Sequence, residues 1–190
     1  MMRTVALASV KPTPWKNGGG VTRDLLLWPT KSKWVLRISV AEVAQSGPFS
    51  AYPGIARWFA VLQGAGVALQ LADGPVRLTP DSAPLHFDGA QAPGCDLLNG
   101  PTLDLNLMAR QDAGRAELQR AVAGVPWAGS APLRAVFTLR AATLHGATRA
   151  PLALPAGSLA YDTTAAPGAP WTLHGNTTSA WWLAFDAHDR

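Results

Sequence analysis

The sequence predicts an all-β protein made of two similar units. Its 190 residues include 18 glycines and 16 prolines, and because these turn-forming residues are spread along the chain, few stretches are long enough for a helix. Several of the intervening stretches alternate apolar and polar residues, as strands with one buried face do. Segments of the first half also return in the second half, in the same order. A hydrophobic content of 48% is enough for a globular core.

Two segments carry the strand prediction. Residues 34–41, WVLRISVA, and residues 102–108, TLDLNLM, both alternate strictly. In each segment one face is apolar, which is the face expected to be buried. The other face carries polar side chains that can form a binding surface: Arg37 and Ser39 in the first segment, and Asp104 and Asn106, next to Met108, in the second.

Residues 58–71, WFAVLQGAGVALQL, predict a β-hairpin, in which two apolar strands turn through the glycines of residues 64–66. Residues 112–124, DAGRAELQRAVAG, are the one segment that fits a helix. Their apolar residues fit a strand equally well, so the sequence does not decide between helix and strand for this segment.

An internal repeat sets the expected domain organisation. Residues 60–69, AVLQGAGVAL, resemble residues 135–144, AVFTLRAATL, at an offset of 75, and the segment from Leu78 resembles the segment from Leu154 at an offset of 76. Repeated segments in the same order indicate two tandem copies of one antiparallel unit, a double barrel or double sandwich. We expect a first barrel over residues 1–110 and a second over residues 111–190.

The two copies differ in one instructive place. The first has DLNLM, with Asp104 and Asn106, where the second has the bulky apolar WWLAF of residues 181–185. The inward face of a small barrel is either filled by apolar side chains or left as a ligand cavity. The first barrel is therefore expected to bind a ligand, and the second to be mainly structural.

Charge and cysteine content exclude several classes of protein. The net charge of +4 comes from basic residues scattered singly, so we expect no nucleic-acid partner. Cys95 is the one cysteine, which excludes an internal disulfide and a cysteine metal cluster, and it is expected to be a small buried core residue. There is no run of 18 apolar residues and no signal-peptide core, so we expect no membrane association and a cytoplasmic location.

The stretch PWKNGGGVT, residues 14–22, has the composition of a phosphate-binding loop but not its spacing. A P-loop places its lysine after the last glycine and leads into a helix, whereas Lys16 precedes the three glycines and Pro29 follows soon after. The nucleotide interpretation therefore fails. The simplest structural interpretation is a tight connection between the two barrels, because glycine permits backbone conformations that other residues avoid.

Metal and nucleophile chemistry are not predicted. A catalytic metal needs three or more converging ligands, and the four histidines, among them His86, lie far apart in the sequence with no His-x-His pair. There is also no Gly-x-Ser-x-Gly motif. We expect neither a metal nor a cofactor.

What remains is a set of polar and basic residues in strands or beside glycine turns. Guanidinium and ammonium groups with amide and hydroxyl groups suit a small carboxylate, which arginine holds through paired hydrogen bonds. An alternative stays open, in which Arg37 and Asp104 form a structural ion pair. The predicted ligand-binding residues are Lys16, Asn17, Arg37, Ser39, Arg57, Asp104 and Asn106.

Four ordered motifs within residues 13–110 resemble the HutD/Ves family of small bacterial bicupin proteins. They are WKNGGGVTRDL, WVLRISVAEV, SGPFSAYPGIARWFAVLQG and DLNLM. The resemblance implies a bicupin fold without a metal and a role in tuning histidine utilisation, with N-formylglutamate or urocanate as the bound carboxylate. It also adds motif positions expected to form or support the pocket wall: Trp15, Phe49, Ser50 and Met108.

Two further functions stay open from the sequence. A metal-free enzyme acting on a related metabolite would use Asp104 or Lys16 as its general acid or base. A scaffold protein would use an exposed apolar patch, for example as the interface of a homodimer. The tryptophans expected to form such a patch lie in the second half: Trp127, Trp171, Trp181 and Trp182.

Overall fold

The computed structural model describes residues 1–166, 168–175 and 179–188. It is 54% strand and 3% helix, so the predicted all-β class is confirmed. The chain divides into two compact units, one of residues 11–112 and one of residues 1–10 together with residue 113 onward. The first ten residues belong to the latter unit because β1 (Arg3–Ala6) pairs with β16 (Ser158–Asp162), whereas the sequence prediction began the first barrel at residue 1.

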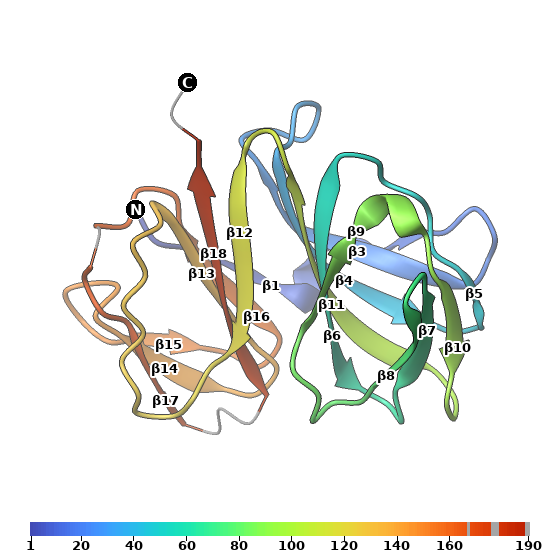
Figure 1. Cartoon of the computed structure of the whole chain (residues 1–190). Coiled ribbons are helices and arrows are strands. Elements are labelled where there is room, and N and C mark those ends of the chain that lie inside the picture. Colours follow the sequence, from blue (N-terminus) through green and yellow to red (C-terminus); the bar gives the residue numbers. More distant parts are fainter. Residues whose placement is uncertain (167, 176–178, 189–190) are drawn as a thin grey trace. The chain divides into compact units, whose positions relative to one another are not determined.

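The unit of residues 11–112 contains two sheets. The larger has the order β2 (Thr13–Pro14), β3 (Gly20–Trp28), β4 (Leu36–Val43), β11 (Thr102–Arg110), β6 (Ile55–Gln63), β9 (Leu85–Asp88). The smaller has the order β5 (Gly47–Pro48), β10 (Gly94–Leu97), β7 (Val67–Leu71), β8 (Gly74–Leu78). A short 3₁₀ turn, η2 (Gly89–Gln91), follows β9. In Figure 1, β7, β8 and β10 lie on one side of this unit and β4, β11 and β6 on the other.

The core of this unit lies between its two sheets. The larger sheet contributes apolar side chains such as Phe59, and the smaller sheet contributes Leu69 and Cys95. Cys95 is 1% exposed, so its predicted role as a buried core residue is confirmed. Burial, with the Asp104 and Asp96 carboxylates, raises the pKa of its thiol to about 12, so it stays protonated.

The second unit repeats this plan. Its larger sheet has the order β1, β16, β13 (Leu133–Thr138), β18 (Ala180–Ala187), β12 (Gly114–Arg120), and its smaller sheet has the order β15 (Leu152–Leu154), β14 (Ala142–His145), β17 (Thr172–Gly175). A 3₁₀ turn, η1 (Leu7–Ser9), follows β1. The order β4-β11-β6-β9 of the first unit thus matches β12-β18-β13-β16, and β10-β7-β8 matches β17-β14-β15. The repeat read from the sequence therefore corresponds to a repeat in topology.

Two sequence predictions about local structure are resolved by these sheets. The hairpin predicted for residues 58–71 is wrong: β6 and β7 are both strands, but they belong to different sheets and β7 pairs with β8 instead. A chain that crosses between the two sheets of a sandwich has the same apolar strands and glycine turn as a hairpin. The segment left open between helix and strand, residues 112–124, contains strand β12.

Strand register identifies equivalent positions in the two units. Asp104 pairs with Val61, and Trp182 pairs with Val136. Val61 and Val136 are 75 residues apart, the offset of the sequence repeat. Asp104 and Trp182 therefore occupy the same place in their units, one a buried acid and the other a large apolar side chain.

Candidate functional site

A pocket of about 600 Å³ opens in the unit of residues 11–112. Its wall is formed by strands β2, β3, β4, β5, β6 and β11 and by two loops. One loop joins β2 to β3, and the other precedes β6. The lining residues are Thr13, Pro14, Trp15, Lys16, Asn17, Thr22, Asp24, Arg37, Ser39, Ala41, Val43, Pro48, Phe49, Ser50, Tyr52, Arg57, Phe59, Asn106 and Met108.

Strand register arranges the polar side chains of the pocket in rows. Met108 on β11 is paired with Arg37 on β4 and with Arg57 on β6, so these three residues lie side by side across three strands. In the next row Asn106 is paired with Ser39 and with Phe59. Neighbouring strands are about 4.8 Å apart, which puts the backbones at the two arginines about 10 Å apart. The pocket thus has an arginine at each end.

Arg57 occupies one end and is almost fully buried, at 6% exposure. Its Nη2 donates to Asn106 Oδ1 at 3.0 Å, and its guanidinium lies 5.2 Å from the ring centre of Phe49 and 5.7 Å from that of Tyr52. Within the described part of the chain its Nε and Nη1 have no hydrogen-bond partner and no carboxylate pairs with it. Burial, with a smaller contribution from Arg37, lowers the pKa of Arg57 to about 10 against a raising effect of Tyr52, so the group stays charged at neutral pH.

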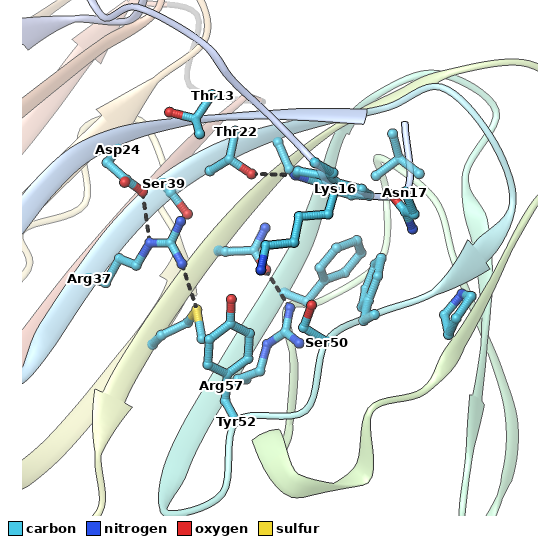
Figure 2. A pocket seen from close by; sticks show the side chains of 18 of the residues that line it. Thr13, Lys16, Asn17, Thr22, Asp24, Arg37, Ser39, Ser50, Tyr52 and Arg57 are labelled. Atoms are coloured by element: carbon cyan, nitrogen blue, oxygen red, sulfur yellow. Dashed lines mark hydrogen bonds and ion pairs between the residues drawn. The ribbon is translucent and has the colours of Figure 1, made fainter. Parts of the chain in front are cut away.

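Arg37 occupies the other end and has a carboxylate partner. Its Nε donates to Asp24 Oδ1 at 2.7 Å, and its Nη1 lies 4.0 Å from the sulfur of Met108. Figure 2 shows Asp24, Arg37 and Ser39 gathered together. The ion pair that the sequence left open between Arg37 and Asp104 is wrong, because Asp24 is the partner of Arg37. Asp24 comes from β3, the neighbour of β4, where it pairs with Ser39.

The loop of residues 15–20 is the stretch that superficially resembled a phosphate-binding loop. It connects β2 to β3 as a hairpin within one unit, so the prediction of a connection between barrels is wrong. Asn17 Oδ1 accepts from the backbone of Gly19 at 3.0 Å, which closes the turn. Trp15 Nε1 donates to Thr22 Oγ1 at 2.8 Å and so holds the indole against the pocket wall. Lys16 extends from this loop into the pocket, toward the end occupied by Arg57 (Figure 2).

Gly20 is the glycine of this loop that has no room for a side chain. A Cβ there would lie 2.3 Å from the carbonyl oxygen of Glu42 and 3.2 Å from the Trp15 ring. Gly20→Ala must therefore push β3 from β4 or displace Trp15, and we expect it to lower the free energy of unfolding by about 1–3 kcal/mol. Urea denaturation measures this, with Gly47→Ala as control because a Cβ at Gly47 meets nothing within 4 Å. Equal losses in the two variants would contradict the argument.

Ten of the eleven predicted site residues line the pocket, and Asp104 does not. It lies on the same strand face as Asn106 and Met108, as predicted, but is fully buried. Thr102 Oγ1 donates to its Oδ2 at 2.7 Å, while its Oδ1 has no hydrogen-bond partner in the described part of the chain. Burial raises the pKa of Asp104 to about 7. Of the two acid–base candidates of the enzyme alternative, only Lys16 is at the pocket surface.

Sequence reasoning missed several residues of the wall, chiefly Asp24, Tyr52, Thr13 and Thr22. Tyr52 belongs to a Tyr-Pro-Gly stretch, whose composition is typical of a turn, yet its ring packs on the Arg57 guanidinium. Asp24 lies on β3, directly across from the polar face of β4. Predicting the pairing of residues 20–28 with residues 36–43 would have placed Asp24 at the site.

Other groups considered from the sequence are not part of this pocket. Among the residues that the structure describes, no group of three or more His, Cys, Asp or Glu side chains is arranged to hold a metal ion. His86 is an exposed residue of β9 whose ring stacks on Trp58 at 4.5 Å. The described residues also include no helix with the length and hydropathy to span a membrane.

The tryptophan patch proposed for a scaffold or dimer face is not exposed. Trp171, Trp181 and Trp182 are at most 3% exposed, and Trp127 is partly buried against the same core. Trp182 stacks on Trp127 at 4.9 Å with an interplanar angle of 7°. That prediction is therefore wrong for these residues: Trp127, Trp171 and Trp182 pack in one core of their unit, and Trp181 is buried as well.

Comparison with known sequences places this chain in a family. The family model HutD matches residues 7–176. An uncharacterized 21.2 kDa protein in the hutC 3' region of Pseudomonas putida is 40% identical over 111 residues, 56% of this chain and 57% of that protein. Protein Ves of Citrobacter koseri is 32% identical over 109 residues, 55% of this chain and 56% of that protein. The chain thus matches a little over half the length of each.

Solved structures agree on the fold over the whole chain. HutD from Pseudomonas fluorescens SBW25, in a formate condition, has a TM-score of 0.88 at 24% identity and full coverage of both chains. A conserved protein of unknown function from Pseudomonas aeruginosa PAO1 has a TM-score of 0.85 at 27% identity, also with full coverage. An oxalate decarboxylase from Lactobacillus farciminis, at 9% identity, shares the cupin fold with a TM-score of 0.60 over 96% of this chain and 85% of that one. The chain is a bicupin and belongs to the HutD family.

Proposed function

We propose that this protein binds a small carboxylate metabolite in the pocket of residues 11–112 and acts as a ligand-binding regulatory protein. The observation that carries the proposal is Arg57. A buried guanidinium without a carboxylate partner is costly, and such groups persist where a ligand completes them. Lys16 adds a second positive charge on the same side of the pocket.

The remaining walls suit a small organic molecule. Trp15, Phe49 and Phe59 provide an aromatic side, with Phe49 and Phe59 rings 5.6 Å apart. Asn106, Ser39 and Ser50 supply amide and hydroxyl groups for its polar atoms. A pocket of mostly apolar wall with a few converging polar groups is the usual form of a metabolite site.

We propose histidine utilisation as the biological context, acting in the cytoplasm. The support is membership of the HutD family and the relative named for the hutC 3' region. The candidate ligands are N-formylglutamate and urocanate, both small carboxylates that the family resemblance implies.

Thermal unfolding with a panel of carboxylates tests this function. The panel contains N-formylglutamate, urocanate, glutamate and formate. A ligand at a hundred times its dissociation constant adds about 2.7 kcal/mol, which raises Tm by roughly 5–10 °C for a chain of this size. An unchanged Tm with every compound would contradict a carboxylate site.

Arg57→Met separates binding from stability. We expect it to weaken binding of the responding carboxylate about 10- to 100-fold, because a charge-assisted hydrogen bond is lost. The fold should keep its stability within about 1 kcal/mol, because the substitution also removes a desolvated charge. Titration calorimetry and urea denaturation measure the two effects. Arg77→Met, a matched change at an exposed residue of β8, should alter neither.

A further inference from the structure

Given the proposed function, the charges at the two ends of the pocket determine which carboxylates it accepts. The two ends of the pocket differ in charge. At one end Arg37 is paired with Asp24, so the pair carries no net charge. At the other end Arg57 and Lys16 lie without a carboxylate partner in the described part of the chain.

The Arg37–Asp24 pair offers both a donor and an acceptor. Asp24 uses Oδ1 for Arg37, and its Oδ2 makes no hydrogen bond within the described residues. Its side chain keeps 30% of its exposure and that of Arg37 keeps 18%, so both remain reachable from the pocket. The hydroxyl of Ser39, on the strand position paired with Asp24, lines the same end.

This donor and acceptor match an uncharged amide-like group. The guanidinium of Arg37 can donate to a carbonyl oxygen, while Asp24 can accept from an N–H. A second carboxylate at this end would have no hydrogen to give Asp24, and its charge would be repelled by that carboxylate. The end near Arg57 and Lys16 has no such negative group and suits a carboxylate.

We propose that the pocket selects a monocarboxylate that carries a neutral amide-like or imidazole-like group at its far end, and that Asp24 is the residue that excludes dicarboxylates. Of the two candidate ligands, this favours urocanate, which has one carboxylate and a neutral imidazole, over N-formylglutamate, which has two carboxylates. The ligand's carboxylate lies toward Arg57 and Lys16, and its neutral group toward Arg37 and Asp24. The two arginines lie on strands separated by one strand, about 10 Å apart at the backbone, so a chain of a few carbons between the two groups spans the pocket.

Pairs of compounds that differ only in one end group test the proposal. Succinamate and succinate form one pair, and glutaramate and glutarate form another; in each, an amide replaces a carboxylate of almost the same size. Titration calorimetry of the full chain should give binding of the amide member about tenfold tighter, the effect of one like charge a few ångströms away in a partly exposed site. In Asp24→Asn the preference should disappear or reverse.

Controls separate this inference from the proposed function. Asp73→Asn removes the same charge from the exposed turn between β7 and β8 and should leave the preference unchanged. A wild-type protein that binds the dicarboxylate as tightly as its amide partner would overturn the selection by Asp24, and this holds whether or not the variant folds. Carboxylate binding that Arg57→Met weakens would then still support the proposed function. Binding of no compound in the pairs or the panel would overturn both.

Discussion

Asp104→Asn should make the stability of the protein respond differently to pH. Asp104 is fully buried, and burial raises its pKa from 3.8 to about 7, against the lowering effect of the Thr102 hydroxyl. The unfolded chain loses this proton near pH 4, while the folded protein holds it until near pH 7. Between these values the folded state binds more protons, so the free energy of unfolding falls as pH rises.

The expected magnitude is large. At about 1.36 kcal/mol per pH unit, the contribution of Asp104 to stability is fully present below pH 4 and about 4 kcal/mol smaller above pH 7. Asparagine has no such titration and keeps an oxygen that can accept from Thr102. Urea denaturation at steps between pH 4 and pH 8 should therefore show the variant gaining about 4 kcal/mol relative to the wild type as pH rises.

A second substitution checks the assignment to this carboxyl group. Thr102 Oγ1 donates to Asp104 Oδ2, and this hydrogen bond lowers the pKa of Asp104. Thr102→Val removes the donor and raises the pKa of Asp104 in the folded protein, so the window in which stability falls should extend to higher pH. Curves for Asp104→Asn and wild type that stay parallel across the whole range would show that Asp104 does not titrate as argued.

Trp182→Ala should strongly destabilise the second unit. Trp182 is 3% exposed, stacks on Trp127, and lies 6.5 Å from Trp171 between ring centres. Removing a buried tryptophan leaves a cavity that the surrounding sheets cannot close, with a cost of about 3–5 kcal/mol. Urea denaturation measures the loss. Trp182→Phe is the matched control, since it keeps an aromatic ring in the same place and should lose much less.

Asp104→Asn and Trp182→Ala change equivalent positions, and their different expected effects reflect the different roles of the two units. Position 104 in the first and position 182 in the second are equivalent by register, yet one is an acid beneath a pocket and the other a packing residue. A loss below about 1 kcal/mol in Trp182→Ala would contradict the structural role proposed for the second unit.

The polar face of the site followed from strand periodicity. Period-two alternation predicts a common kind of surface for Arg37 and Ser39 on one strand and Asn106 on another, and these strands are neighbours in the structure. Alternation is a local property of the backbone, so it can be read from a single segment. The residues near the glycine loop, Lys16 and Asn17, were selected for their chemistry and also line the pocket.

Other features depend on which strands become neighbours. The connection after β6 was predicted as a hairpin because glycine turns and apolar strands do not say whether the next strand joins the same sheet. Asp24 was missed for the same reason: its importance comes from its pairing with Ser39 across β3 and β4.

Composition and periodicity alone were enough to predict an all-β chain with two repeated units. Strand alternation can be seen within one segment, and the repeat can be seen in the order of segments along the chain. Tertiary packing decided which polar side chains line the pocket and which are buried away from it. Asp104 and Asn106 look alike in the sequence, two residues apart on one strand face. Only the closing of two sheets around one of them makes Asp104 a buried acid and leaves Asn106 beside Arg57 in the pocket wall.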